Sequence, residues 1–240
     1  MLKVGLCGFT INQKSYYQTF PVLEVQQTFY EPPPLTTLQR WRDRAPENFE
    51  FTLKAWQIIT HRATSTTYRR MKSPPTAAQR EGCGSFQDTP IVARAWKVTL
   101  ACARILRATS VLFQCPASFR PTEENVAALR RFFGSVERPD NLRFLFEPRG
   151  AWPQELLAEL TRELGLIDAL DPFLRSSVTP ELLYWRLHGI GSSYRAYTDD
   201  ELRSLTEKVR SASTAYVMFN NIPRPQDARR FLELADSHGG

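Results

Sequence analysis

Residues 182–193 read LLYWRLHGIGSS, an apolar run that ends in a glycine-rich turn. Successive side chains of a β-strand point to opposite faces, so Tyr184, Arg186 and His188 would share one face and the apolar residues between them the other. Glycines in the turn let the backbone bend and approach a ligand closely. The stretch therefore predicts a strand that delivers a charged and a titratable side chain to its own end, or else a structural ion pair followed by an ordinary turn.

Similar short apolar runs recur on both sides of this stretch. The predicted strands cover 3–9, 22–30, 49–56, 110–116, 142–149, 164–172, 182–188 and 215–221. The predicted helices cover 35–45, 91–108, 122–133, a segment opened by Pro153, 198–211 and 225–237. Residues 15–20 are too short for a stable helix of their own, and few residues separate strands six and seven. Helices 1 and 6 of the pattern are therefore expected to be reduced.

Eight strands that alternate with mostly helical connections in 240 residues predict an α/β fold. The specific prediction is a single (β/α)8 barrel of the TIM type over residues 1–240. Residues 62–90 are rich in Ser, Thr, Pro and Gly and carry extra basic residues, which predicts a long, lid-like excursion after strand three. Loops of this length are either functional or disordered, and the sequence leaves both open.

Polar residues collect at the predicted strand ends. In a (β/α)8 barrel the C-terminal ends of the strands form the functional face, and polar residues occupy that position in seven of the eight strands. A single inward polar side chain is usually a satisfied structural group, but so many at one level predict a shared site. The residues are Glu24, Gln26, Lys54, Gln114, Glu147, Arg149, Asp168, Asp171, Arg186, His188 and Asn220.

Composition narrows the classes of function. The net charge is +6 and the pI is about 9.3, which leaves an anionic partner open. No apolar run is long enough to span a bilayer, and the opening MLKVGLCGF lacks the features of a signal peptide, so we expect a cytoplasmic protein without membrane contact. The four cysteines form no CxxC pair and have no histidine at zinc-ligand spacing, so we expect them to be reduced and mostly buried.

A set of motifs marks the chain from one end to the other. They are EVQQTFYEPP (24–33), FTLKAWQIITH (51–61), LFQCPASF (112–119), FEPRGAW (146–152), YWRLHG (184–189) followed by Tyr194, and MFNN (218–221). In order and spacing this set resembles the YecE-like family, a group of unknown function whose fold is a TIM-type barrel. The resemblance covers nearly the whole chain and implies the same barrel with a site, but no chemistry. Gln26 stands where relatives usually have Asn, and Cys7 and Phe9 depart from the family's opening GxSGW pattern.

The polar strand ends suit an enzyme that binds an anionic or sugar-like small molecule and moves a proton, either a hydrolase or a lyase or isomerase. In a partly desolvated pocket, the pKa values of a carboxylate and of an opposing ammonium or imidazole group can shift toward neutral pH. The catalytic candidates are Glu24, Lys54, Glu147 and His188. The candidates for ligand binding are Gln26, His61, Gln114, Arg149, Asp171, Arg186, Tyr194 and Asn220. Arg149 and Arg186 would hold a phosphate or carboxylate, with backbone donors from the turn after strand seven.

Three alternatives stay open. Glu24, Glu147, Asp171 and His188 could hold a divalent metal, but neighbouring cations can neutralise these carboxylates without any ion, so we expect no cofactor. The abundance of arginine and the basic excursion suggest nucleic-acid binding. Such a function predicts that the protein binds oligonucleotides and that this binding weakens as the salt concentration rises. A non-catalytic ligand-binding barrel is the third, and assays of turnover in Glu147→Gln and Arg186→Ala variants would separate it from an enzyme.

Overall fold

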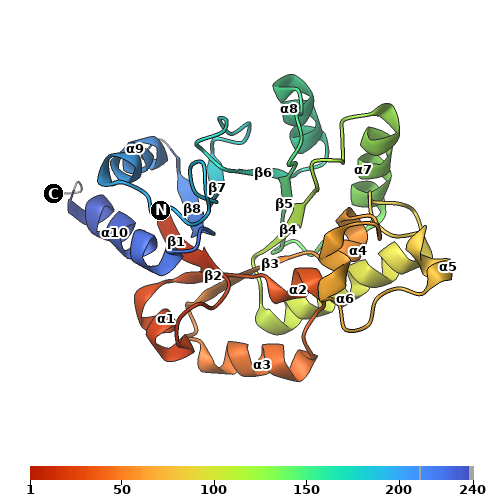
Figure 1. Ribbon diagram of the computed structural model, residues 1–240, viewed down its shortest axis with the longest axis horizontal. Helices are drawn as coiled ribbons and strands as arrows, with labels where there is room; N and C mark the ends of the chain where they lie inside the picture. The colour runs from red at the N-terminus through yellow and green to blue at the C-terminus, as the bar shows by residue number, and fades with distance from the viewer. Residues whose placement is uncertain (211, 238–240) are drawn as a thin grey trace. The chain divides into compact units, whose positions relative to one another are not determined.

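The computed structural model describes residues 1–210 and 212–237. Eight strands, labelled in Figure 1, follow one another in chain order around a closed barrel. Their bounds are β1 (Leu2–Cys7), β2 (Val22–Val25), β3 (Glu50–Lys54), β4 (Ser110–Gln114), β5 (Arg143–Glu147), β6 (Ile167–Leu170), β7 (Leu182–Leu187) and β8 (Thr214–Phe219). The predicted (β/α)8 barrel is confirmed.

Helices and short helical turns connect most of the strands. They are α1 (Gln13–Thr19), α2 (Gln27–Tyr30), α3 (Leu35–Arg44), α4 (Gln57–Thr60), η1 (Thr66–Arg70), α5 (Ala77–Arg80), α6 (Pro90–Leu106), α7 (Glu123–Ser135), α8 (Gln154–Glu163), α9 (Asp199–Val209) and α10 (Arg224–Ser237). α9 ends at Val209, and its predicted end at Ser211 lies outside the described residues. None of the helices described is both long enough and apolar enough to cross a membrane.

The first and sixth connections are reduced, as predicted. The first one contains only the short helix α1, which forms over seven residues. Oδ1 of Asn12 accepts the N–H of Lys14 at 2.9 Å and caps the helix, and the buried Tyr16 donates its hydroxyl to the carbonyl of Val22 at 2.8 Å. These contacts supply the stability that so short a helix lacks in isolation.

β2 is shorter than the predicted range 22–30. The strand ends at Val25, and Gln26 already has helical backbone angles (φ −90°, ψ −27°) as the residue before α2. The Thr28 hydroxyl lies 2.7 Å from the carbonyl oxygen of Lys54 and 3.2 Å from that of Val25, and these two acceptors hold the helical turn in place. Gln26 and Thr28 therefore do not lie on the strand face that carries Glu24. Local side-chain hydrogen bonding of this kind competes with strand formation.

The chain divides into two compact units, which we describe separately. The first comprises residues 1–24, 46–50 and the described residues from 167 on. In this unit β8 pairs in parallel with both β1 and β7, and β6 pairs with β7. α10 packs against α9, β1 and β8 (Figure 1). Because the strands are parallel, the residues that follow β1, β7 and β8 lie at one edge of this sheet.

The second unit comprises residues 25–45 and 51–166. Here β4 pairs in parallel with β3 and β5, and α6 packs against α3 and α4. Aromatic rings fill much of its interior. Phe113, for example, contacts the rings of Trp96, Phe133 and Phe144, with centroid separations of 5.8, 5.0 and 5.3 Å. Burial of such large rings supplies much of the hydrophobic stabilisation of the unit.

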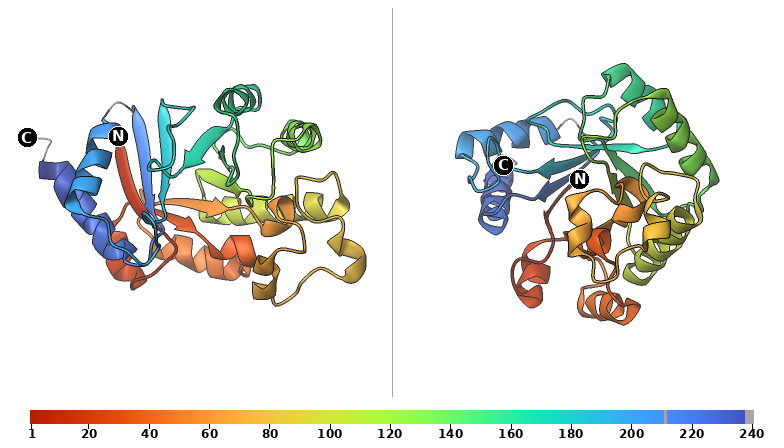
Figure 2. Two further views of the ribbon diagram at one scale, coloured as in Figure 1. Left: turned by 45° about the horizontal axis from the view of Figure 1, so that its top comes forward. Right: turned by 45° about the vertical axis from the view of Figure 1, so that its right-hand side comes forward.

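The 62–90 segment is an ordered excursion of the second unit. The backbone N–H groups of Gly84 and Phe86 donate to the carbonyls of Ile58 and Ile59 at 2.7 and 2.9 Å, and the Phe86 ring is buried. Figure 2 shows the segment, coloured orange to yellow, leaving the region of α4 and returning to the start of α6. The segment is therefore ordered, whereas its role as a lid stays a prediction.

All four cysteines are buried and unpaired as thiols, in agreement with their spacing in the sequence. Burial raises the pKa of the Cys7 and Cys115 thiols well above the ordinary value, and raises that of Cys102 to about 11. Burial also raises the pKa of Cys83. The thiolate form, which is the reactive one, is therefore disfavoured at every cysteine.

Candidate functional site

Most of the predicted site residues fall into two clusters, one in each unit. The first, which we call the arginine cluster, contains Glu24, Asp171, Tyr184, Arg186 and His188. The second, which we call the lysine cluster, contains Phe29, Lys54, His61, Gln114, Glu147 and Arg149. Each cluster lies at or just past the carboxyl ends of strands in its own unit. That both belong to one shared site stays a prediction.

A buried ion pair is the centre of the arginine cluster. Glu24 in β2 and Arg186 in β7 are both 0% exposed. Nε of Arg186 donates to Oε1 and Oε2 of Glu24 at 3.1 and 3.0 Å, and Nη2 donates to Oε1 at 2.9 Å. The Tyr184 hydroxyl donates to Oε2 of the same carboxylate at 2.9 Å. The carboxylate is thus satisfied by several donors, as a buried charge requires.

This pairing changes the role expected for Arg186. The sequence predicted that Arg186 would hold a phosphate or carboxylate of a ligand through two N–H groups. Nε and Nη2 instead bind Glu24, so an anion that took those positions would have to displace a buried carboxylate. The predicted catalytic role of Glu24 meets the same obstacle, because its oxygens are occupied by Arg186 and Tyr184.

His188 is the most exposed member of the arginine cluster, with 23% of its side chain accessible. Its Nε2 lies 3.3 Å from Nη1 of Arg186. A guanidinium group can only donate, so Nε2 accepts and the neutral imidazole carries its proton on Nδ1. Nδ1 faces Oδ2 of Asp171 at 3.6 Å, and the His188 backbone N–H donates to the same oxygen at 3.1 Å. Burial alone would raise the pKa of Asp171, but the hydrogen bonds from His188 and Phe173 outweigh it and lower that pKa.

The turn after β7 is tied to its surroundings. Gly189 has φ 97°, and a Cβ at this position would lie 2.3 Å from the carbonyl oxygen of Ser192, so only glycine fits. Its N–H donates to the hydroxyl of Tyr197 at 2.7 Å. Tyr194, predicted to bind ligand, is 80% exposed and is a surface residue in this structure. Asn220 directly follows β8 and is partly buried.

Lys54, at the end of β3, is the centre of the lysine cluster and is 5% exposed. Its Nζ donates to Oε1 of Gln114 at 2.8 Å and lies 3.9 Å from the centroid of the Phe29 ring. The face of an aromatic ring attracts a cation, and more strongly where water is excluded. Phe29 lies in α2, so this contact was hidden from a sequence interpretation that extended β2 as a strand to residue 30.

A second ion pair completes the lysine cluster. Glu147, the last residue of β5, is nearly buried, and its Oε1 lies 2.7 Å from Nε of Arg149. Arg149 is past the end of the strand, and 34% of its side chain is exposed. Gln114 and Glu147 are partners in the register of β4 and β5, so the amide that binds Lys54 neighbours this carboxylate. The cluster therefore combines an ammonium, an amide, a carboxylate and a guanidinium group.

His61 follows α4 and is 4% exposed. Its Nδ1 lies 2.8 Å from Oγ1 of Thr60, and its ring meets Phe29 edge-on with 4.9 Å between the centroids. Burial, followed by the positive charges of Lys54 and Arg149, lowers the pKa of His61 to about 4. His61 is therefore neutral at pH 7 and can both donate and accept a hydrogen bond.

We expect His61 to make the stability of the fold depend on pH between about 6.5 and about 4. Its pKa is lower in the folded state, so the unfolded state takes up the proton first as the pH falls, and the free energy of unfolding drops by about 3 kcal/mol across this window. Above about pH 6.5 the contribution is complete. Urea unfolding at about pH 7 and about pH 4.5 should show a smaller loss in His61→Gln than in the wild type. Equal losses would contradict the assignment.

Arg224 is a candidate ligand-binding residue that the sequence prediction missed. It opens α10, just after β8, and its Nε is buried without a hydrogen-bond partner among the described residues. Nη1 donates to the carbonyls of Asn220 and Asn221 at 3.5 and 3.4 Å. Burial is the main cause of the raised pKa of Cys7, and the charge of Arg224 acts against it, which places this guanidinium near the carboxyl end of β1. The sequence feature that could have identified Arg224 is the segment NNIPRP (220–225), which places an arginine shortly after a predicted strand.

The ligand set considered for a metal is divided between the units. Glu24, Asp171 and His188 lie in the first unit, and Glu147 lies in the second. Within residues 1–210 and 212–237, no group of three or more His, Cys, Asp or Glu side chains is gathered as metal ligands would be. Metal binding by these four residues stays a hypothesis, because the described part of the chain does not gather them into a ligand set.

Comparison with known proteins finds a family that spans nearly the whole chain. The family described as "Protein of unknown function DUF72" matches residues 12–239. The UPF0759 protein YunF of Bacillus subtilis (strain 168) is 29% identical over 144 residues, which cover 54% of this chain and 45% of that protein. The match thus spans about half the length of this curated relative.

Solved structures share the fold. A DUF72 family protein from Enterococcus faecalis V583 is 18% identical, with a TM-score of 0.76 over 98% of this chain and 96% of that chain. A D-psicose 3-epimerase solved in the presence of D-fructose is 11% identical, with a TM-score of 0.62 over 98% of both chains. At these identities the likeness establishes the barrel fold alone.

Proposed function

Because the chain belongs to the DUF72 family, whose function is unknown, we propose a function from its own side chains. The protein is an enzyme that acts on a sugar-like or anionic small molecule by acid/base chemistry. The lysine cluster is its catalytic centre, with Glu147 as the base and Lys54 as the acid. The arginine cluster, with its internal ion pair, has a supporting role.

The observation that carries this proposal is the order of groups along the ends of β3, β4 and β5. An ammonium, an amide and a carboxylate stand on successive strands, because Lys54 donates to Gln114 at 2.8 Å and Gln114 lies opposite Glu147. A proton donor and a proton acceptor on the two sides of a hydrogen-bonding amide suit proton transfer at a ligand's hydroxyl or carbonyl group. The low exposure of both charged groups strengthens their electrostatic effect on a bound ligand.

The surrounding groups favour a ligand rich in hydroxyl groups. Gln114 and the neutral His61 can each donate and accept a hydrogen bond, which matches the hydroxyl groups of a sugar. Arg149, partly exposed beside Glu147, adds a cation for a phosphate or carboxylate substituent. The D-psicose 3-epimerase solved with D-fructose present supports the sugar class by analogy of fold only.

Turnover of a panel of ketoses, aldoses and their phosphate esters tests the proposal. We expect the wild type to convert at least one member and Glu147→Gln to lower kcat about 100- to 10,000-fold, because the amide cannot accept the proton. The matched control is Glu137→Gln, an exposed carboxylate paired with Arg104, which should keep the wild-type rate. A wild-type rate in Glu147→Gln would contradict the assignment. Saturable binding of a panel member without conversion would favour the non-catalytic ligand-binding barrel.

Nucleic-acid binding receives less support from the surface charges. Several helical arginines already pair with carboxylates. Arg130 binds both Glu159 and Glu163, and Arg230 binds Asp199. Such pairing reduces the positive potential that a phosphate backbone would meet. The overall positive charge keeps this function as the second candidate.

A further inference from the structure

A cavity of about 700 Å³ lies in the second unit, and none of the six lysine-cluster residues lines it. Its walls come from the start of α4 and the residue before it, the first half of α6, residues 73–82 of the excursion and residues 31–32. Sites that bury a small molecule have volumes of roughly 300–1,000 Å³, so the space suits a ligand of that size. The proposed catalytic centre leaves this cavity unexplained.

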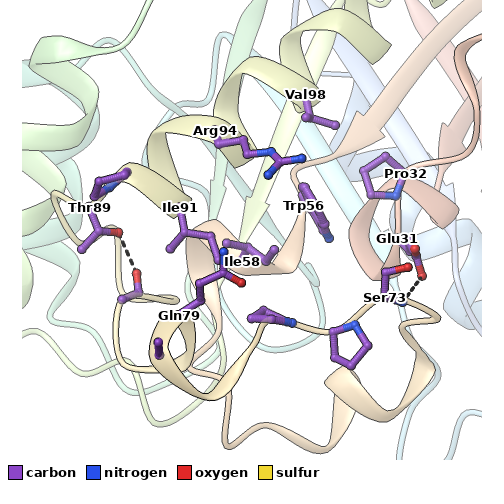
Figure 3. A pocket seen from close by; sticks show the side chains of 15 residues that line it. Glu31, Pro32, Trp56, Ile58, Ser73, Gln79, Thr89, Ile91, Arg94 and Val98 are labelled. Carbon is purple, nitrogen blue, oxygen red and sulfur yellow. Dashed lines mark hydrogen bonds between the residues drawn. The ribbon is translucent and has the colours of Figure 1, made fainter.

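The walls of the cavity are largely rigid. Four prolines contribute to them, namely Pro32, Pro74, Pro75 and Pro90, and each ring fixes the local φ angle. On one edge the backbone N–H groups of Lys72 and Ser73 donate to the carboxylate of Glu31. On another edge the hydroxyl of Thr89 donates to the carbonyl of Gly82 at 2.7 Å (Figure 3). The cavity is therefore preformed, which lowers the entropy cost of binding.

The guanidinium of Arg94 is a donor that faces this apolar space. Figure 3 shows Trp56 extending into the pocket from the loop after β3 and Arg94 extending from α6. Nε1 of Trp56 is fully buried, so the indole presents its apolar ring surface, and not its N–H, to the cavity. Arg94 is exposed at the cavity, and no carboxylate pairs with it among residues 1–210 and 212–237. Its guanidinium can therefore bind an anionic group of a ligand.

The charges of the lining favour an anion over a cation. Glu31 is the acidic residue of the lining, and its carboxylate already accepts the N–H groups of Lys72 and Ser73. The guanidinium of Arg94, by contrast, has no carboxylate partner in the described part of the chain. An anionic group on a ligand would therefore gain a partner at Arg94, whereas a cationic group would compete with two backbone donors for Glu31.

We propose that this cavity is a second binding site, for a small aromatic carboxylate. The carboxylate binds the guanidinium of Arg94. The aromatic body lies between the indole ring and the apolar wall that Ile58, Ile91 and the prolines form. Planar rings bury a large apolar area with few rotatable bonds, which suits a rigid, proline-lined space.

Isothermal titration with 2-naphthoate tests this proposal, with 2-naphthylmethylamine as the ligand of the same ring and opposite charge. We expect saturable binding of the naphthoate and about tenfold weaker binding in Arg94→Gln, because a hydrogen bond to a charged group is lost. The matched control is Arg104→Gln, on the same helix and paired with Glu137, which should bind as the wild type does. The amine should bind at least about tenfold more weakly than the naphthoate.

Two further variants locate the ligand. Trp56→Leu removes the ring against which the aromatic body of the ligand packs and should weaken binding about fivefold. Ala78→Trp places a large ring in the cavity from the exposed surface of α5 and should abolish binding while the thermal midpoint is kept. Unchanged affinity in Arg94→Gln, equal binding of the amine, or no saturable binding of the naphthoate would overturn the proposal. Arg94 and Ala78 are both exposed, so their variants decide the question even where Trp56→Leu fails to fold.

Discussion

Replacing Arg186 with methionine is expected to lower the free energy of unfolding by about 3–5 kcal/mol. The change leaves the buried carboxylate of Glu24 without the guanidinium that binds both of its oxygens. An uncompensated buried charge is among the most destabilising states that a single substitution can create. Urea unfolding at neutral pH measures the loss directly, and for a chain of this size the thermal midpoint should fall by roughly 6–20 °C.

Two further variants show whether the ion pair itself is responsible. Glu24→Leu combined with Arg186→Met should recover much of the loss, since apolar residues can replace a buried pair at little cost. Arg130→Met, which removes a surface arginine from its pairs with Glu159 and Glu163, should leave the midpoint nearly unchanged. A loss in Arg186→Met no larger than in Arg130→Met would show that the buried pair is not a main support of the fold.

Gly84→Ala is expected to cost about 2–4 kcal/mol of stability. Gly84 has φ 82°, and a Cβ there would lie 2.3 Å from backbone atoms of His61 and Arg62. Backbone cannot move aside as a flexible side chain can, so the hydrogen bond from Gly84 to Ile58 would be strained or lost. Urea unfolding measures the effect. Binding of 2-naphthoate should weaken as well, because this contact holds the excursion in place.

The matched control is Gly134→Ala in α7, where no atom lies within 4 Å of the added Cβ. Alanine favours a helix over glycine by roughly 0.5–1 kcal/mol, so this variant should be as stable as the wild type or slightly more stable. The same chemical change would thus have opposite signs at two positions. A loss of similar size in both variants would show that the geometry at Gly84 is not the cause.

The barrel could be predicted because strand number and order depend on apolar runs and on the residues that interrupt them. Runs such as 110–116 and 182–188 carry that information locally. The order of the 62–90 excursion does not arise locally. It depends on Phe86, which enters an interior built from rings of distant helices, and on Gly84, which adopts a backbone angle that composition does not reveal.

For the candidate site, the sequence placed side chains at strand ends but could not assign their partners. Alternation put Glu24 and Arg186 on inward faces, yet which cation meets which carboxylate depends on strand register and side-chain packing. The alternation of Val22, Glu24 and Gln26 also fitted a longer strand, and the helical turn of α2 ended it sooner. The contact of Phe29 with Lys54 follows from that turn.

The burial of the four thiols has a consequence for following the motions of the chain. Alkylating reagents attack the thiolate, so a buried cysteine with a raised pKa reacts only when the structure around it opens. Cys7 lies in the first unit, and Cys83, Cys102 and Cys115 lie in the second. The alkylation rate of Cys7 therefore reports the opening of the first unit, and the rates of the other three cysteines report the opening of the second. Comparison of these rates reveals whether the two units open in a single event or independently.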